Sequence, residues 1–216
     1  RNKFVLAAEK VFFEALDFRD GKFVSDVPLV DSYFDLKRRL EGHRFDIVAA
    51  AVQNWSTDVT RSWIRHWIIK SGRSGVCFSG GLSMNIKTNG DILDMPEVSW
   101  LSVPPSGGDE SISLGACYAV QAEKFRAVKP LEDAYLGDDA DDWDSDWIGL
   151  IEKAGGSEKD FDLRNGIDTN CVARLLANDC IVARCSGRAE FGARALGNRS
   201  ILANPSNPSN LKLINE

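Results

Sequence analysis

The chain has 216 residues and a formal net charge of −6, and 44% of its residues are hydrophobic. These values fit one globular domain or two small ones, with enough apolar residues to bury a core. No apolar stretch approaches the roughly 20 residues of a membrane-spanning helix, and no signal-peptide pattern is present, so we expect a cytoplasmic protein with no membrane partner. The five cysteines form no C-x-x-C pair and lie mostly in apolar stretches. This pattern predicts reduced core thiols rather than disulfides or zinc ligands.

The negative charge is concentrated in one segment. Residues 132–146 contain eight carboxylates and no lysine or arginine. Without them the chain is close to neutral, which argues against a nucleic-acid partner bound on a broad basic face. The segment also lacks an apolar period and follows a helical pattern that ends at Lys129-Pro130. We therefore expect a first domain over residues 1–130, an acidic linker over 131–155 and a second domain over 156–216.

The first domain alternates strand and helix patterns. Residues 4–16 fit an amphipathic helix, whereas residues 13–27, centred on Asp20-Gly21, fit a hairpin, and both interpretations stay open. Residues 45–70 repeat apolar side chains every four positions, which predicts a long helix that ends at Gly72 and has its tryptophans in the core. The elements predicted next are a buried strand at 76–78, a helix from about 82, a strand at 100–103 and a helix at 109–125.

The second part of the chain has the same mixed character. Trp143 and Trp147 are spaced to start a short helix that runs to Lys153. The elements predicted after it are a helix at 169–178, buried strands at 180–183 and 200–203, and a helix from 210. Strands that lead through glycine turns into helices indicate an α/β protein with sites at the strand ends.

Three arginines and three glycines alternate between Gly187 and Arg199, in the segment that joins the last two predicted strands. Glycine allows the backbone to approach a ligand, and arginine binds phosphate or carboxylate through a fixed fork of donors. A solvated basic turn is the alternative. The flanking strands favour an anion site, because binding residues are commonly mounted on loops between core strands.

Two glycine turns of the first domain are candidate ligand sites. Gly80-Gly81 lies between a strand and a helix, which suits phosphate or ribose, but such a turn also needs glycine without any ligand. Asp109 follows the turn at residues 104–108. It can cap the next helix, or it can bind a metal or organise magnesium and phosphate.

Together these loops resemble the O-carbamoyltransferase family of nodulation-factor and antibiotic biosynthesis. The motifs that carry the resemblance are residues 78–85, 104–116 and 187–202, in this order, and Ala-Tyr-Leu-Gly at 134–137 resembles the family's inter-domain junction. The third motif is the most specific, since the first two are shared with the related tRNA threonylcarbamoyl transferases. The resemblance extends from about residue 46 to residue 203.

The resemblance implies a two-domain enzyme. The first domain would be the second half of an actin-like ATPase (ribonuclease-H-like) domain. The second would be the truncated start of an α/β domain that resembles threonylcarbamoyl-adenylate synthases. In the family, carbamoyl phosphate and ATP give carbamoyl-adenylate and pyrophosphate in the latter domain, and the ATPase-like domain transfers the carbamoyl group to a substrate hydroxyl. The implied partners are therefore small molecules: carbamoyl phosphate, ATP and a hydroxyl-bearing acceptor.

The same resemblance implies the site residues. Gly80, Gly81 and Asn85 would hold the adenylate, and Asp109 would bind an iron-type metal, with magnesium accompanying the nucleotide. The carbamoyl phosphate and ATP site would contain Asn198 and Ser200 and the catalytic residues Arg188, Arg194 and Arg199. A fixed arginine array suits this chemistry, because adenylation develops negative charge on phosphates.

The chain departs from the family pattern in three places. Ala193 stands where proline is common, and Asn204-Pro205-Ser206 replaces Asp-Pro-Arg. The family's metal-binding His-x-x-x-His is missing, since His43 and His66 lie far apart and His66, beside Trp67, is predicted to be structural. We therefore expect these residues to be the middle to late portion of a longer enzyme, inactive by itself.

Two other functions stay open from the sequence. One is a small-molecule kinase or other ATPase of the actin-like superfamily, against which the arginine-glycine segment argues. The other is a non-catalytic nucleotide-binding or scaffolding module. The motifs identify neither the acceptor nor the oligomeric state, a homodimer included.

Overall fold

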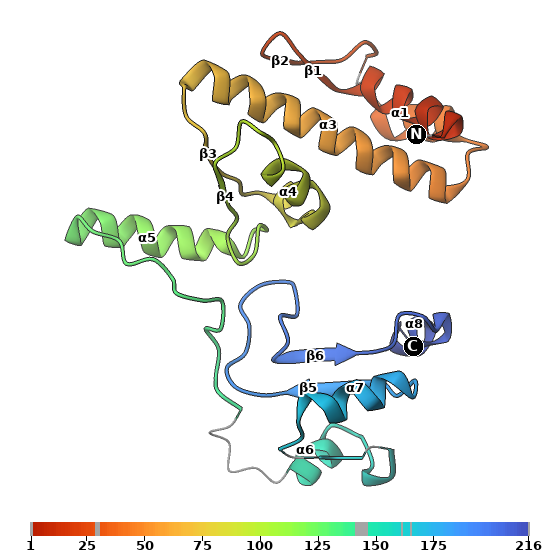
Figure 1. The fold of residues 1–216 in the computed structure, drawn as a ribbon, viewed down its shortest axis with the longest axis vertical. Helices are drawn as coiled ribbons and strands as arrows, with labels where there is room; N and C mark the ends of the chain where they lie inside the picture. Colours follow the sequence, from red (N-terminus) through yellow and green to blue (C-terminus); the bar gives the residue numbers. More distant parts are fainter. Residues whose placement is uncertain (1, 29–30, 141–146, 161, 165, 216) are drawn as a thin grey trace. The chain divides into compact units, whose positions relative to one another are not determined.

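The computed structural model describes residues 2–28, 31–140, 147–160, 162–164 and 166–215. Two compact units divide between Asp109 and Glu110. Both are mixtures of helices and small two-stranded sheets, as predicted for an α/β chain (Figure 1). The three-part division at residues 130 and 155 stays a prediction. Among the described residues no helix combines the length and apolarity that a bilayer span requires.

The first unit begins with a helix and a hairpin, so both interpretations of residues 4–27 hold in succession. Helix α1 (Lys3–Ala15) starts at Asn2, whose side chain accepts a hydrogen bond from the Phe4 N–H at 3.0 Å. Strands β1 (Asp17–Arg19) and β2 (Lys22–Val24) then pair in antiparallel fashion. The turn between them is the predicted Asp20-Gly21, and both residues have positive φ, as a tight hairpin turn requires.

Two further helices complete this part of the unit. Helix α2 (Ser32–Leu40) precedes helix α3 (Phe45–Ser71), which ends at Gly72 as predicted. Helices α1 and α3 pack through a cluster of small and aromatic side chains, namely Val5, Ala8, Phe12 and Ala51.

The predicted core position of the α3 tryptophans is wrong for two of the three. Trp55 stacks on Phe12 with ring centroids 5.6 Å apart and donates to the Leu16 carbonyl. Trp63 and Trp67, however, are 36% and 46% exposed. The core face at this end of α3 is formed by Ile64 and Ile68, one position further along the helix and therefore about 100° around its axis. His66 packs edge-on against Phe18 and Trp67, which agrees with its predicted structural role.

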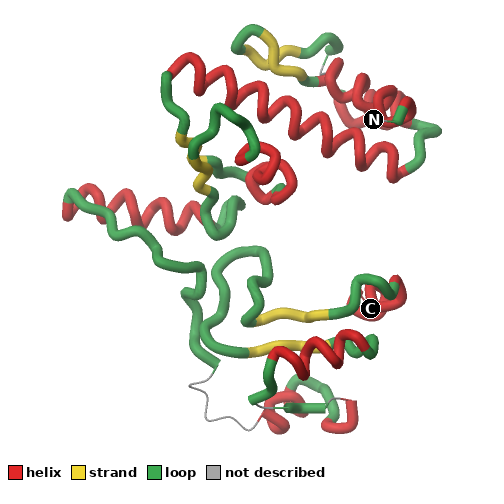
Figure 2. The backbone as a smooth tube through the Cα atoms, viewed as in Figure 1, coloured by secondary structure: helices red, strands yellow, loops and turns green. Residues whose placement is uncertain are grey.

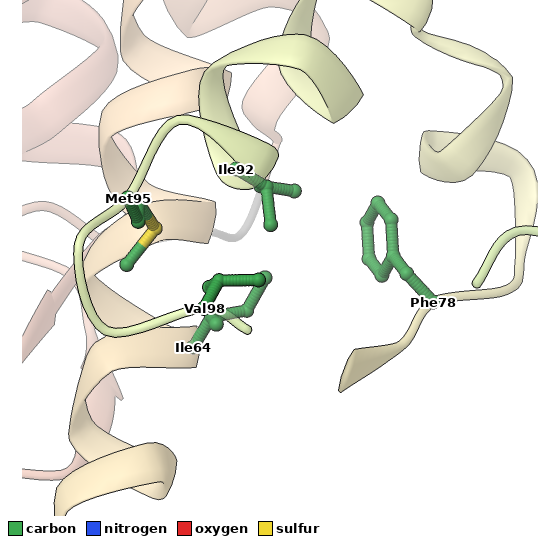
Figure 3. Close-up of a cluster of buried hydrophobic side chains, with 5 residues drawn as sticks. All are labelled: Ile64, Phe78, Ile92, Met95 and Val98. Carbon is green, nitrogen blue, oxygen red and sulfur yellow. The ribbon is translucent and has the colours of Figure 1, made fainter. Parts of the chain in front are cut away.

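A second core lies where α3 packs against residues 76–103. Strand β3 (Gly75–Cys77) pairs in parallel with β4 (Trp100–Ser102), and helix α4 (Ile86–Leu93) lies between them in the sequence. Figure 3 shows the buried side chains that meet there, which are Ile64, Phe78, Ile92, Met95 and Val98. The helix predicted to begin near residue 82 begins at Ile86, because the 3-10 turn η1 (Gly81–Met84) comes first and Asn85 takes the N-cap position.

The second unit contains α5 (Ser111–Phe125), α6 (Trp147–Lys153), η2 (Glu158–Asp160), α7 (Thr169–Ala177) and α8 (Pro208–Asn215). Helix α6 begins at the predicted Trp147, whereas Trp143 lies outside the described residues. Strands β5 (Val182–Cys185) and β6 (Arg199–Leu202) form an antiparallel pair, visible in yellow in Figure 2.

Two further burial predictions for the chain are wrong. Strands β5 and β6 were expected to be buried, but of their residues only Ser200 is, because a sheet of two strands leaves much of its faces open. The cysteines are free thiols, as predicted, but most are not in a core. Cys171 is half-buried, and the exposed ones are Cys77, Cys117, Cys180 and Cys185.

The core between α3 and α4 provides a stability prediction. Ile92 is fully buried, whereas Ile86 on the same helix is 71% exposed. Replacing Ile92→Ala should lower the free energy of unfolding by about 2–4 kcal/mol, since it removes buried methyl groups and leaves a cavity. Ile86→Ala is the matched control and should change it by less than about 0.5 kcal/mol. Urea unfolding measures both, and equal losses would contradict the assigned core.

Candidate functional site

The candidate site is the loop between β5 and β6, residues 186–198, which we name the arginine loop. The strand pairing Cys185↔Arg199 holds its two ends together. Gly197, near the end of the loop, has a φ of +111°, a region that favours glycine. The predicted glycine-dependent turn is therefore present. Arg188 and Arg194 lie in the loop with exposed side chains, and Arg199 begins β6.

The Glu190 carboxylate organises the backbone of the arginine loop. Its Oε1 accepts hydrogen bonds from the N–H groups of Leu196 at 2.9 Å, Asn198 at 2.7 Å and Arg199 at 3.0 Å, and Oε2 accepts a second one from Arg199 at 3.1 Å. These bonds favour the ionised form. The Arg199 N–H contributes most, and the pKa of Glu190 falls from 4.5 to about 2.

The Arg199 side chain binds the backbone from the other direction. Its guanidinium Nη1 donates to the carbonyls of Ser186 and Asn198 at 3.0 and 3.1 Å. Nη2 donates to the carbonyls of Gly187 and Asp138 at 3.1 and 3.4 Å. The arginine expected to grip phosphate thus donates to four main-chain carbonyls.

Asn198 and Ser200 also bind within the loop. The Asn198 amide donates to the Arg188 carbonyl at 2.8 Å, and the buried Ser200 hydroxyl accepts the Gly197 N–H at 2.9 Å. Arg184, on β5, donates to the Gly197 carbonyl and to Asn198 Oδ1. The structure therefore brings Asn198 and Ser200 to the arginine loop, as predicted. Both shape the loop through hydrogen bonds to its main chain.

The predicted inter-domain junction forms one edge of the same site. Residues 134–140 run alongside residues 187–191, joined by the N–H of Gly137 to the Ala189 carbonyl at 3.0 Å and by the reciprocal bond from the Ala189 N–H to Asp138 at 3.0 Å. Arg188 Nε donates to the Gly137 carbonyl at 3.2 Å. The start of the predicted acidic linker is thus hydrogen-bonded to the arginine loop.

In the first unit the two glycine turns lie next to each other. The Gly107 N–H and the Ser106 hydroxyl both donate to the Met84 sulfur, at 3.2 and 3.6 Å. Gly80 and Gly81 are exposed at the surface of the first turn. A backbone with exposed glycines can be approached closely by a ligand.

Asn85 is engaged by its own helix and by α3. Its Oδ1 accepts the Thr88 N–H at 3.1 Å, which caps α4, and its amide donates to Gln53 Oε1 at 3.0 Å. Gln53 also donates to the Thr57 and Thr88 hydroxyls, at 3.1 and 3.2 Å. This hydrogen-bonded set of half-buried and buried polar side chains connects the first glycine turn to α3.

Asp109 does not cap α5, which was one of its two predicted roles. The N-cap of α5 is Glu110, whose side chain makes no capping bond. Asp109 itself is exposed, and in the part of the chain that the structure describes no three His, Cys, Asp or Glu side chains are grouped to hold a metal ion. By themselves, the residues that the structure describes do not fit an iron-type site.

Comparison with known proteins finds a family match in the last part of the chain. Residues 173–216 match the family model described as carbamoyltransferase C-terminus, which spans the arginine loop and both of its strands. Nodulation protein NolO of Bradyrhizobium diazoefficiens is 31% identical over 171 residues, 78% of this chain and 30% of that protein. Nodulation protein U of Sinorhizobium fredii is 30% identical over 212 residues, 98% of this chain and 32% of that protein.

The chain belongs to the carbamoyltransferase family. It spans about a third of the length of these curated relatives. Within this carbamoyltransferase segment, the sequence-based prediction did not assign a role to Glu190. The sequence did contain a signal for this role, because Glu190 is the one carboxylate in an arginine-rich loop. A negative charge that faced the ligand would oppose anion binding, so this carboxylate is expected to face the protein instead.

The pKa of Glu190 gives a pH prediction. Because the pKa is lowered in the folded loop, the stabilisation is fully present above pH 4.5 and is lost as the pH falls toward 2. At pH 3 the carboxylate should therefore still be mainly ionised. An NMR titration of the chemical shift of the Glu190 side-chain carboxyl carbon measures its ionisation. The signal is assigned by comparison with the Glu190→Gln variant. Half-protonation near pH 4.5 would contradict the hydrogen bonding described.

Proposed function

We propose that this chain is part of an ATP-dependent O-carbamoyltransferase that forms carbamoyl-adenylate and passes its carbamoyl group to a hydroxyl of an acceptor. The observation that carries the proposal is the ordered arginine loop within the matched carbamoyltransferase segment. Its exposed guanidinium groups suit phosphate-bearing reactants, because arginine offers paired, charge-assisted hydrogen bonds.

In the proposed adenylation, carbamoyl phosphate, water and ATP react to give carbamoyl-adenylate, phosphate and pyrophosphate. Negative charge grows on the phosphates as pyrophosphate leaves. Arg188 and Arg194 would stabilise this charge from fixed positions, so that little reorganisation is needed during the reaction. The hydrogen bond from Arg188 Nε to the Gly137 carbonyl supports a fixed position for this side chain.

The proposal gives the first unit the transfer step. Exposed Gly80 and Gly81 would allow the adenylate close to the backbone, and Asn85 would keep the turn in shape through its bonds to Thr88 and Gln53. We assign residues 1–130 to the actin-like ATPase fold and residues 156–216 to the start of the threonylcarbamoyl-adenylate-synthase-like fold. The mixed α/β composition and the parallel pairing of β3 with β4 support the first assignment without deciding it.

Arg194→Ala tests the proposal. In the complete protein, we expect carbamoyl-phosphate-dependent release of pyrophosphate from ATP to fall at least about 100-fold, the scale for losing one positioned charge-stabilising donor. Arg174→Ala is the matched control, because Arg174 is an exposed arginine in the last turn of α7. It should retain the wild-type rate.

Two outcomes would count against the proposal. An unchanged rate in Arg194→Ala would remove this residue from the reactive site. A wild-type protein that binds ATP but consumes neither ATP nor carbamoyl phosphate would favour a non-catalytic nucleotide-binding module.

A further inference from the structure

The arginine loop contains two kinds of charged side chain. Glu190 and Arg199, the residue that follows the loop, each make four hydrogen bonds to the main chain. Arg188 makes one to the main chain, to the Gly137 carbonyl, and both Arg188 and Arg194 are exposed to solvent. The two kinds differ in what they can offer to a ligand. The inference drawn from this difference rests on the proposed function. It separates the residues that hold the loop from the residues that bind the anion.

Glu190 occupies the donors that an anion would otherwise use. Backbone N–H groups that converge in a loop form a general anion-binding concavity. Here the N–H groups of Leu196, Asn198 and Arg199 converge on the Glu190 carboxylate instead. A phosphate cannot use the same donors without displacing a carboxylate of the same sign.

Arg199 adds hydrogen bonds to carbonyls of which three also accept a main-chain N–H: Asn198 from Ser186, Gly187 from Ala140 and Asp138 from Ala189. The carbonyls of Ser186, Gly187 and Asn198 come from both ends of the arginine loop, and the Asp138 carbonyl comes from the junction. A planar guanidinium can reach all four because its donors point outward in one plane. Turning this group toward a phosphate would remove one hydrogen bond from the Ser186 carbonyl and the additional hydrogen bond from each of the other three.

We propose that Glu190 and Arg199 are positioning residues, which hold the arginine loop in its binding conformation before the substrates arrive, and that Arg188 and Arg194 bind the phosphates. Glu190 fixes the late part of the loop through its N–H groups. Arg199 ties the two ends of the loop to the junction. The exposed arginines then meet the ligand from a backbone that is already ordered.

The first experiment measures the order of the loop in the absence of substrates. Its readout is the rate of trypsin cleavage after Arg188, with the cleavage site identified by mass spectrometry. Glu190→Ala and Arg199→Gln should be cleaved at least about tenfold faster than the wild type, because cleavage follows the population of the open loop. Glu190→Gln should be intermediate, since its amide oxygen still accepts N–H groups. Glu152→Ala, at an exposed carboxylate on α6, is the matched control.

The cleavage rate after Arg174 reports whether a variant has unfolded more widely. If Glu190→Ala also accelerates cleavage after Arg174, the milder variant Glu190→Gln is used for the comparison with the wild-type cleavage rate after Arg188. Wild-type cleavage after Arg188 in both Glu190 variants would overturn the positioning role.

The salt dependence of the KM for ATP then separates positioning from ligand binding in the pyrophosphate-release assay. Arg194→Gln should weaken that dependence, because it removes a charge that contacts the anion. Arg199→Gln and Glu190→Gln should raise KM and leave the dependence as in the wild type. An equal weakening in Arg199→Gln and Arg194→Gln would show that Arg199 binds the phosphate and would overturn the division of roles.

The two measurements fail separately. If the wild type releases no pyrophosphate, the proposed function fails, and the substrate-free cleavage rates still test the positioning role. If release is normal and the cleavage rates do not change, the positioning role fails while the proposed function stands.

Discussion

The candidate site depends on one carboxylate that is surrounded by main-chain donors. Glu190 accepts hydrogen bonds from the N–H groups of three residues that lie six to nine positions further along the chain. These N–H groups belong to the end of the arginine loop and to the first residue of β6, and an unpaired main-chain donor is costly wherever it is shielded from water. The carboxylate supplies the missing acceptors, so the loop can hold a defined shape without regular secondary structure.

Arg199 complements this arrangement with the opposite charge. Its guanidinium donates to main-chain carbonyls from both ends of the loop and from the junction segment. The acidic stretch after α5 thus begins as part of the site rather than as a plain connector. A loop that is tied at both its N–H and its C=O groups can present Arg188 and Arg194 with little loss of conformational entropy on binding.

Much of the chain's secondary structure follows from local sequence. The four-residue repeat and Gly72 predict α3 to within a residue at its end, and Asp20-Gly21 predicts the β1–β2 turn. The start of α4 did not follow from local sequence. A 3-10 turn occupies residues 81–84, where the helix was predicted to begin, and Asn85 takes the N-cap position. Burial was predicted less well than helix position, as exposed Trp63 and Trp67 show, because it depends on which face of a helix meets the rest of the unit.

The sequence also predicts the members of the site better than their tasks. The motif singles out Arg199, Asn198 and Ser200, and the structure brings all three to the arginine loop. Their hydrogen bonds, however, go to the loop's own backbone, and Glu190 emerges as the organising group. Such tasks depend on the three-dimensional path of the loop, which residue spacing alone does not specify. Amide hydrogen exchange at Leu196, Asn198 and Arg199 in the substrate-free protein at neutral pH is the most direct measurement. We expect exchange at least about 100-fold slower than in an unstructured chain, and exchange at the unstructured rate would contradict a loop ordered by Glu190.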